Sequence, residues 1–406
     1  MRRDIPFTSW RDLSIRSRGR EVILFGAADI AEKTYRRIGG ECIVSGMVDN
    51  AQNLWGDHVL GLSVEKPESL LARERTVYVV VTTTSFRDVS EQLVGMGFEP
   101  LVDFMVSPFL NDLRIIDELE SVKTTVMFSS GSAPSEDPKF GGGIYELAIE
   151  KDVWEYRKKM SGNTYGIIPF DDGYLTVDAN RGLVHFDQRY NIVRTGTVPT
   201  GARGHGITIS ADQEAIFLAC SGKDALLVFD KDLRLKNEFS ISNKITMDGT
   251  PQHHCNDCVW SNGFVYVCMF SVSGNWKQDV FDGGIVEMHP QTGEIQSILR
   301  NDLHMPHNVA LINGQMVVLE SLPGHLRLNN FSVAGTFPAF SRGLAHDGAW
   351  FYIGQSRNRN YSRNLGVSNN ISIDVGVIIF DEITKASRFV QLHPRLSEIH
   401  AIQVLD

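Results

Sequence analysis

The 406-residue sequence has few cysteines, no long apolar segment and no excess of positive charge. Its five cysteines are too few for a disulfide framework, and their odd number is typical of a reducing cytoplasm. No stretch approaches the ~18 consecutive apolar residues of a membrane span. The basic amino-terminal segment also lacks the apolar core of a secretory signal. We therefore expect a cytoplasmic protein without a membrane span.

Charge and composition bound the class of protein further. The 39 Lys+Arg and 49 Asp+Glu residues give a net charge of −10, which argues against a nucleic-acid-binding protein. With 42% hydrophobic and 22% charged residues, the chain can bury a large core. Because the length exceeds one ordinary domain of ~150 residues, we predict two domains. Residues 1–120 are predicted to form an α/β Rossmann-like domain with a linker helix, and residues 121–406 an all-β six-bladed β-propeller.

The pattern at the amino terminus alternates between strand and helix. Strands are predicted at 21–26, 42–50 and 76–84, a helix at 86–98 and a linker helix at 110–120, with a further helix after Gly26. Segment 76–84 is almost wholly apolar or β-branched, as a strand buried on both faces should be. The order predicts a small parallel sheet with crossover helices.

The first strand-to-helix turn, at Gly26, lies where a dinucleotide-binding fold holds phosphate. Only the first glycine of the G-x-G-x-x-G pattern is present, and Asp29 would repel phosphate. Asp49 lies near the position of a ribose-binding acid. We therefore weigh a turn that no longer binds a nucleotide against one that binds a nucleotide sugar through Gly26, Asp29 and Asp49. The missing glycines disfavour an NAD-dependent oxidoreductase.

Three segments carry a resemblance: LFGAADIAEKTYRRI, MVDNAQNLWGDHVLGLSV and VVVTTTSFRDVSEQLVGMGF. Together they resemble the small Rossmann-type domain of bacterial nucleotide-sugar acyltransferases and sugar methyltransferases. The phrase formed by Val48, Asp49, Asn50, Gly56, Gly61 and Val64 is its most specific part. The resemblance covers about residues 20–105 and implies a carbohydrate pathway more than a particular ligand.

From residue 122 onward, short strands separated by Gly, Asp or Asn turns recur with a period of about 45 residues, which is typical of propeller blades. Five repeats span 165–198, 205–242, 256–302, 307–337 and 342–392. Residues 124–160 supply three further strands, and 400–406 supply one. Joining the two ends of the chain completes a sixth blade and removes exposed sheet edges.

The repeat places particular residues around one mouth of the central channel, where the innermost strands begin. These ring positions are Tyr165, His205, His254 or Asn256, His307, Arg342 and His400. Long loops at 129–143, 271–284 and 355–374 are predicted on the same face, and loops of such length are commonly functional. We predict that His205, His254, His307 and His400 bind a divalent metal ion, such as Zn, Mn or Fe. The alternative is that these histidines only hydrogen-bond to neighbouring loops.

Candidate catalytic groups accompany the histidines. Glu320, at the end of a second strand, is a candidate metal ligand, a candidate hydrogen-bond partner of a metal ligand or a candidate general base. Asp257 and Tyr165 are candidates at the mouth. Cys255 and Cys258 form a single C-x-x-C, which cannot complete a zinc site alone, so we expect them to pack as small apolar residues.

A basic cluster within an acidic chain suggests an anionic ligand such as a phosphate or carboxylate. Its members are Arg203, Arg342, Arg357, Arg359 and Arg363. Trp276 is a candidate for stacking on a sugar. For any single arginine, an ordinary solvated loop residue is the competing interpretation.

The segments 253–276, 305–326 and 341–357 resemble an uncharacterised bacterial propeller family known only as a domain of unknown function. The Met-Pro-His phrase at His307 and the Arg-Gly-Leu phrase at Arg342 carry this resemblance, which implies that both residues matter but supplies no reaction.

The first functional hypothesis is a metal-dependent lyase, hydrolase or isomerase of bacterial glycan or sugar-nucleotide metabolism, acting on a small anionic sugar or sugar nucleotide at the mouth. The alternative is a non-catalytic scaffold that binds a protein or glycan. Assembly into a homo-oligomer is left open.

Overall fold

A computed structural model describes residues 7–73, 76–244, 249–338, 340–357 and 370–405. The chain divides into two compact units, Met1–Leu119 and Glu120–Asp406. This boundary lies one residue before the one predicted from the sequence.

The amino-terminal unit contains a six-stranded sheet with the order β3-β4-β2-β1-β5-β6. Its strands are β1 (Glu21–Phe25), β2 (Val44–Val48), β3 (His58–Val59), β4 (Leu62–Glu65), β5 (Val77–Val81) and β6 (Phe104–Val106). Its helices are α1 (Trp10–Arg16), α2 (Asp29–Ile38), α3 (Phe86–Gly95), α4 (Asn111–Glu120) and the short η1 (Gln52–Leu54), η2 (Pro67–Arg73) and η3 (Pro108–Leu110). All neighbouring strands are parallel except the β3–β4 hairpin, so this is an α/β unit with a largely parallel sheet.

Side-chain alternation along β1 explains why helices cover both faces of this sheet. Val22 and Leu24 pack in a cluster with residues of α1 and α2, whereas Ile23 and Phe25 pack in a cluster with residues of α3. Every residue of β5 is buried, as the apolar composition of that segment predicts for a strand covered on both faces.

The second unit consists of six four-stranded antiparallel sheets. The first five blades, in chain order, are β10 (Thr164–Phe170), β11 (Gly173–Asp178), β12 (Gly182–Asp187), β13 (Ile192–Gly196); β14 (Gly204–Ile209), β15 (Ala215–Cys220), β16 (Ala225–Asp230), β17 (Leu235–Ser240); β18 (Cys255–Ser261), β19 (Phe264–Met269), β20 (Gly283–Met288), β21 (Ile295–Leu303); β22 (Pro306–Ile312), β23 (Gln315–Glu320), β24 (His325–Leu328), β25 (Ser332–Thr336); β26 (Phe340–His346), β27 (Phe351–Ser356), β28 (Gly376–Phe380) and β29 (Ser387–Gln391). The short helix η4 (Trp276–Gln278) lies between β19 and β20.

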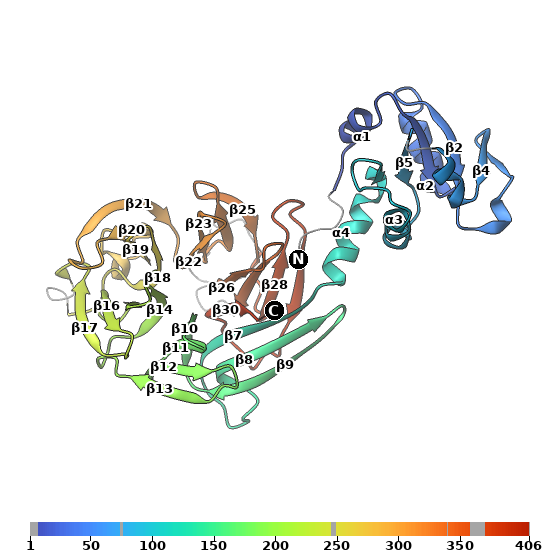
Figure 1. Ribbon diagram of the computed structural model, residues 1–406. Coiled ribbons are helices and arrows are strands. Elements are labelled where there is room, and N and C mark those ends of the chain that lie inside the picture. The colour runs from blue at the N-terminus through green and yellow to red at the C-terminus, as the bar shows by residue number, and fades with distance from the viewer. Residues whose placement is uncertain (1–6, 74–75, 245–248, 339, 358–369, 406) are drawn as a thin grey trace. The chain divides into compact units, whose positions relative to one another are not determined.

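The sixth blade confirms the predicted ring closure. It combines β30 (Ala401–Val404) with β7 (Lys123–Pro134), β8 (Gly141–Glu150) and β9 (Val153–Ser161), in the order β30-β7-β8-β9. Figure 1 shows the six sheets arranged around a common centre. The innermost strands contact one another in the cyclic order β10, β14, β18, β22, β26 and β30. The unit is therefore a six-bladed β-propeller closed by the carboxyl-terminal strand.

A bulge recurs in the innermost strand of the first five blades. In the first blade, Thr164 pairs with Asp178 and Ile167 with Thr176, so three steps along β10 match two along β11. The extra residue lies at Tyr165–Gly166, His205–Gly206, Asn256, Asn308–Val309 and Arg342–Gly343 in successive blades. Bulges bend a strand and redirect its side chains. They recur here at the end of the ring where the innermost strands begin, which we call the mouth.

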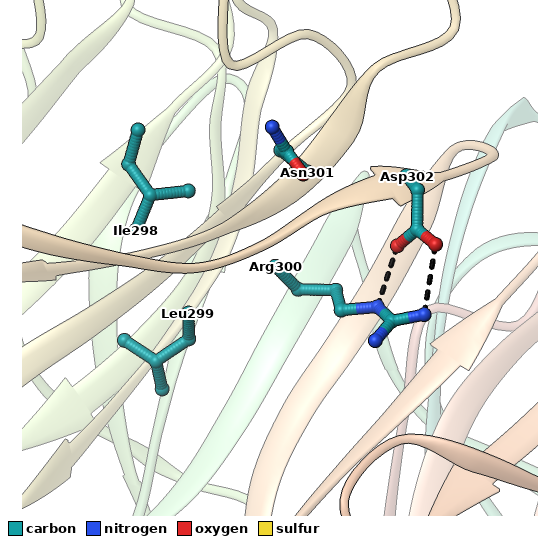
Figure 2. Close-up of a pocket in the computed structure, with 5 residues that line it drawn as sticks. All are labelled: Ile298, Leu299, Arg300, Asn301 and Asp302. Atoms are coloured by element: carbon teal, nitrogen blue, oxygen red, sulfur yellow. Dashed lines mark hydrogen bonds and ion pairs between the residues drawn. The ribbon is translucent and has the colours of Figure 1, made fainter.

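The outermost strand of the third blade forms a pocket of about 310 Å³. Five consecutive residues, Ile298–Asp302, line it (Figure 2). Arg300 and Asp302 form an ion pair across it with N–O distances of 2.5 and 2.8 Å. Register shifts between β20 and β21 produce this irregular segment. The pocket includes none of the residues that the sequence assigns to a site.

Candidate functional site

The strand register identifies which residues occupy equivalent positions at the mouth. Tyr165, His205, Asn256, Asn308 and Arg342 are the bulged residues, and His400 precedes β30. The sequence placed His307 at the ring position of the fourth blade, but His307 pairs in register with Leu319 and the bulge begins at Asn308. The extra residue is invisible in the repeat pattern, which explains the one-residue difference.

Four of the predicted residues come together at the mouth. The ring of Tyr165 lies between two imidazoles, with centroid distances of 4.7 Å to His205 and 4.6 Å to His400. The centroid of His205 is 6.0 Å from that of His254 and 6.1 Å from that of His400. His205 and His254 are half-buried residues.

A buried carboxylate that the sequence reasoning missed organises one side of this cluster. Nε2 of His400 lies 2.7 Å from Oε2 of Glu398, and Nη1 of Arg342 donates to the same oxygen at 3.2 Å. Only 6% of each of the Glu398 and His400 side chains is exposed. The signal available in the sequence was the spacing of Glu398 and His400, because residues two apart share a side of an extended segment. We call Tyr165, His205, His254, Arg342, Glu398 and His400 the mouth cluster.

Burial keeps His205 and His254 neutral. Desolvation, followed by the nearby His254 and His400 rings and Arg342, lowers the pKa of His205 well below its ordinary value. Burial and then the charges of Arg342, Lys277 and Arg203 lower the pKa of His254 to about 3. Neutral imidazoles can accept a proton or bind a metal ion.

His307 lies apart from the other histidines, behind an aromatic side chain. The ring of Phe270 is 4.2 Å from His254 and 5.1 Å from His307 between centroids. Nδ1 of His307 lies 2.7 Å from the Ser321 hydroxyl and 3.0 Å from the carbonyl oxygen of Met305. Burial lowers the pKa of His307 well below its usual value. His307 therefore supports the wall of the mouth.

Trp276 belongs to the same wall. Its ring centroid lies 4.9 Å from that of Phe270 and 5.8 Å from that of Phe281, and it is buried. In this structure Trp276 packs within the protein, whereas the sequence suggested that it would stack on a sugar.

Asp257 directly follows the bulge of β18 and pairs in register with Cys268. Its Oδ1 accepts a hydrogen bond from the Cys258 amide at 2.8 Å, and its Oδ2 accepts one from Nδ2 of Asn308 at 3.2 Å. A Cβ at Gly206 would lie 1.7 Å from Oδ1 of Asp257, so glycine at 206 makes room for this carboxyl group. Burial raises the pKa of Asp257 to about 7 despite these hydrogen bonds.

Glu320 lies in a separate cluster. It accepts hydrogen bonds from the amide and Nδ1 of His304 at 2.9 and 2.8 Å, and from Nε of Arg327 at 2.6 Å. Nδ1 of His325 lies 3.2 Å from its other side. Hydrogen bonds from these groups hold the pKa of Glu320 well below its ordinary value against the opposing effect of burial. The structure thus places Glu320 among its own partners and does not bring it to the mouth cluster.

The predicted basic residues are only partly brought together. Arg342 joins the mouth cluster and lies 4.7 Å from the ring centroid of Phe340. Arg203 is exposed, with a φ of 50°. Arg357 is also exposed, and its Nη2 donates to the carbonyl oxygen of Pro394 at 3.0 Å. Arg359 and Arg363 lie outside the described residues.

Within the described ranges, no group of three or more His, Cys, Asp or Glu side chains is arranged to hold a metal ion. Cys255 and Cys258 are fully buried or nearly so, and burial raises the pKa of each thiol well above its ordinary value. These thiols pack as small apolar groups.

At the amino-terminal turn, Gly26 has a φ of 113°, and a Cβ there would lie 3.1 Å from backbone atoms of Thr82. Asp49 accepts hydrogen bonds from the amides of Ala27 at 2.9 Å and Ala51 at 2.8 Å. Its half-buried carboxylate thus braces the turn. Asp29 is exposed as the first residue of α2.

None of the helices in the described part of the chain combines the length and apolarity needed to cross a membrane. A search of curated proteins finds no match to the chain. Among solved structures, a chain in the crystal structure of a nidogen/laminin complex is 13% identical, with a TM-score of 0.48, and the match covers 70% of this chain and 98% of that one. A protein of unknown function from Bacteroides caccae is also 13% identical, with a TM-score of 0.47, covering 69% of this chain and 98% of that one.

A family model described as "Domain of unknown function (DUF4915)" matches residues 162–406. The match begins just before β10 and continues to the end of the chain. It therefore includes the first five blades, the closing strand and every residue of the mouth cluster. Because this match covers more than half of the sequence, the chain belongs to the DUF4915 family.

Proposed function

We propose that the propeller mouth is an enzyme active site that transfers protons on a small anionic sugar derivative, in a lyase, hydrolase or isomerase reaction. The observation that carries this proposal is the buried Glu398 carboxylate, which binds both His400 and Arg342 beside Tyr165. A carboxylate that orients an imidazole is a recurring arrangement for general acid–base catalysis.

Each group has a role that follows from its surroundings. His400, oriented by Glu398, acts as the general base. Asp257, with its pKa raised to about 7, carries a proton near neutral pH and serves as the acid. Two titratable groups whose surroundings move their pKa values apart are suited to act as an acid and base pair. The positive charges of Arg203, Lys277 and Arg342, which act on His254, favour an anionic substrate.

A metal-assisted version of this chemistry is the second candidate, and three imidazoles favour it. His205, His254 and His400 approach one another with the centroid distances given above, and burial leaves His205 and His254 neutral, as a divalent metal such as Zn, Mn or Fe requires. The side chains would have to move inward to coordinate one ion. His307 would then act as a supporting residue behind Phe270.

Elemental analysis separates the two versions. The wild type would be compared with His254→Ala and with His346→Ala, a matched control at the opposite end of an innermost strand. About one metal ion per chain that is lost only in His254→Ala would establish the metal-assisted version. Wild type without metal after incubation with zinc, manganese or iron would eliminate it and leave proton transfer by the side chains.

The amino-terminal unit receives a separate proposal. We infer a Rossmann-like identity from the strand order β4-β2-β1-β5-β6 and the glycine turn at Gly26. A nucleotide sugar would bind at the ends of β1 and β5 only if the Asp49 carboxylate releases an amide partner. Titration with uridine and guanosine diphosphate sugars tests this, with Asp49→Asn as the variant. Titration of both proteins without any heat of binding would contradict it.

Turnover of uronic acids, sugar phosphates and nucleotide sugars is the direct test of the mouth. We expect Glu398→Gln and His400→Gln to lower kcat by about 10²–10⁴-fold on any accepted substrate. Glu294→Gln, an exposed residue beyond β20, should match the wild type. A ligand that binds at the mouth without being converted would instead establish a binding module.

A further inference from the structure

One side chain joins four blades at the centre of the propeller. Asn308 lies in the bulge of β22, and its Nδ2 donates to Oδ2 of Asp257 at 3.2 Å and to the carbonyl oxygen of His400 at 3.0 Å. Its Oδ1 accepts a hydrogen bond from the amide of Gly343 at 2.6 Å. These partners belong to the third, sixth and fifth blades.

The hydrogen bonds of Asn308 use its whole amide group. An amide nitrogen has two hydrogens to donate and an amide oxygen accepts. Here the nitrogen faces two oxygens and the oxygen faces an N–H, so the reverse orientation would break all three interactions. Among the side chains that fit this space, only an amide meets both kinds of partner.

The backbone of Asn308 is adapted to the same task. Its φ of 49° lies in the left-handed region, which asparagine tolerates better than most residues. The bulge supplies this conformation and turns the side chain towards the centre of the ring.

We infer that Asn308 is a positioning residue that fixes the acid Asp257 and the base His400 relative to one another. This inference rests on the proposed function for the roles of those two residues. The Asp257 carboxylate and the backbone carbonyl of His400 bond to the same nitrogen, so a movement of one blade against the next would be transmitted to both residues. The carboxyl-terminal segment, which carries both Glu398 and His400, is thereby tied to the third, fourth and fifth blades, which carry Asp257, Asn308 and Arg342.

Asn308→Gly is the sharpest test because glycine keeps the positive φ and removes only the amide. Asn313→Gly is a matched control: Asn313 lies in the turn after β22, is exposed, and has a φ of 51°. Carboxyl ¹³C resonances of labelled aspartate would report the titration of Asp257, identified with Asp257→Asn. Imidazole ¹⁵N resonances would report His400, identified with His400→Gln. Both are read on the full chain and need no substrate.

Loss of the amide donor should raise the pKa of Asp257 by about one pH unit, since a hydrogen bond to the charged form favours it. The His400 resonances should move in the same variant, and neither change should occur in Asn313→Gly. If Asn308→Gly does not fold, Asn308→Asp keeps an acceptor for Gly343 and places a second carboxylate beside Asp257, which should raise the Asp257 pKa further. Unchanged Asp257 and His400 signals in a folded Asn308 variant would overturn the inference.

Substrate turnover distinguishes a failure of this inference from a failure of the proposed function. If the mouth is catalytic, Asn308→Gly should also lower kcat by about 10–100-fold and shift its pH profile. The wild type could turn over no substrate while the Asp257 and His400 resonances still respond to substitution of Asn308. That result would support the positioning role of Asn308 and contradict the proposed catalytic function.

Discussion

Two buried carboxylates of the propeller have similar partners and different surroundings. Glu320 is bonded to two histidines and an arginine, and Glu398 to one histidine and one arginine. Glu320 belongs to a cluster within the fourth blade, with partners from β24 and from the segment before β22. Glu398 connects Arg342 of the fifth blade with His400 at the start of the closing strand.

The two carboxylates differ in the further contacts that their bonded partners make. Among the side chains around Glu320, Arg327 donates to the carbonyl oxygen of Phe331 at 2.8 Å, and His304 stacks on Phe281 with ring centroids 6.1 Å apart. The side chains around Glu398 meet Tyr165 and, through it, His205. Residue type and burial are therefore insufficient to identify a site. The informative feature is whether the direct partners of the carboxylate belong to the mouth cluster, as His400 and Arg342 do for Glu398.

The largest difference between these carboxylates should appear in stability. Glu320→Ala should lower the free energy of unfolding by about 3–5 kcal/mol, because it leaves Arg327 and two histidines without their buried acceptor. Chemical denaturation followed by circular dichroism would measure the loss.

Glu398→Gln provides the comparison for that experiment. We expect a cost of about 1–2 kcal/mol, since the amide oxygen still accepts from one of its partners. Equal losses in the two variants would show that Glu398 is as structural as Glu320 and would remove the main support for an active site.

The histidines of the two regions should respond to pH in opposite directions. The pKa of His254 falls to about 3 in the folded protein through burial, so the unfolded chain takes up a proton that the folded chain does not. Its contribution is complete above pH 6.5 and is lost as the pH falls, by about 2 kcal/mol at pH 5. The hydrogen bond to Glu320 raises the pKa of His304, so its contribution is present below pH 6.5 and lost as the pH rises through the folded value.

Urea unfolding at several pH values between 5 and 8 would separate these effects. His254→Gln should weaken the loss of stability in acid, and His304→Gln should steepen it. A His254→Gln protein with the same acid dependence as the wild type would contradict the assignment of a buried, neutral imidazole at this position.

The architecture of the propeller was predictable because each blade repeats one pattern. Apolar strands separated by turn residues marked the blades, and the unpaired strand near His400 had to join residues 124–160. That strand is β30. In the other unit the short β3–β4 hairpin was not predicted, because two-residue strands leave no periodic signal.

The site was predictable only in part. Histidines at equivalent places in the repeat indicated the mouth correctly for His205, His254 and His400. The bulges were not predictable, because an extra residue in a strand changes the register without changing the composition. This explains why His307 was assigned to the position of Asn308. Glu398 was missed because the repeat has no equivalent residue in the other blades.

Replacement of Arg327 or Arg342 by lysine should give the smallest difference in stability between the two carboxylate clusters. In Arg327, Nε donates to Glu320 and Nη1 to Phe331, so Arg327→Lys loses two directed bonds and should cost about 1 kcal/mol. Arg342→Lys retains a positive charge near Glu398 and should cost about 0.5 kcal/mol. Thermal unfolding would measure both, and binding of an anionic sugar should weaken only in Arg342→Lys, because only Arg342 lies at the mouth. Weaker binding in Arg327→Lys would show that the Glu320 cluster also contacts the ligand, and the distinction between the two carboxylates would then no longer hold.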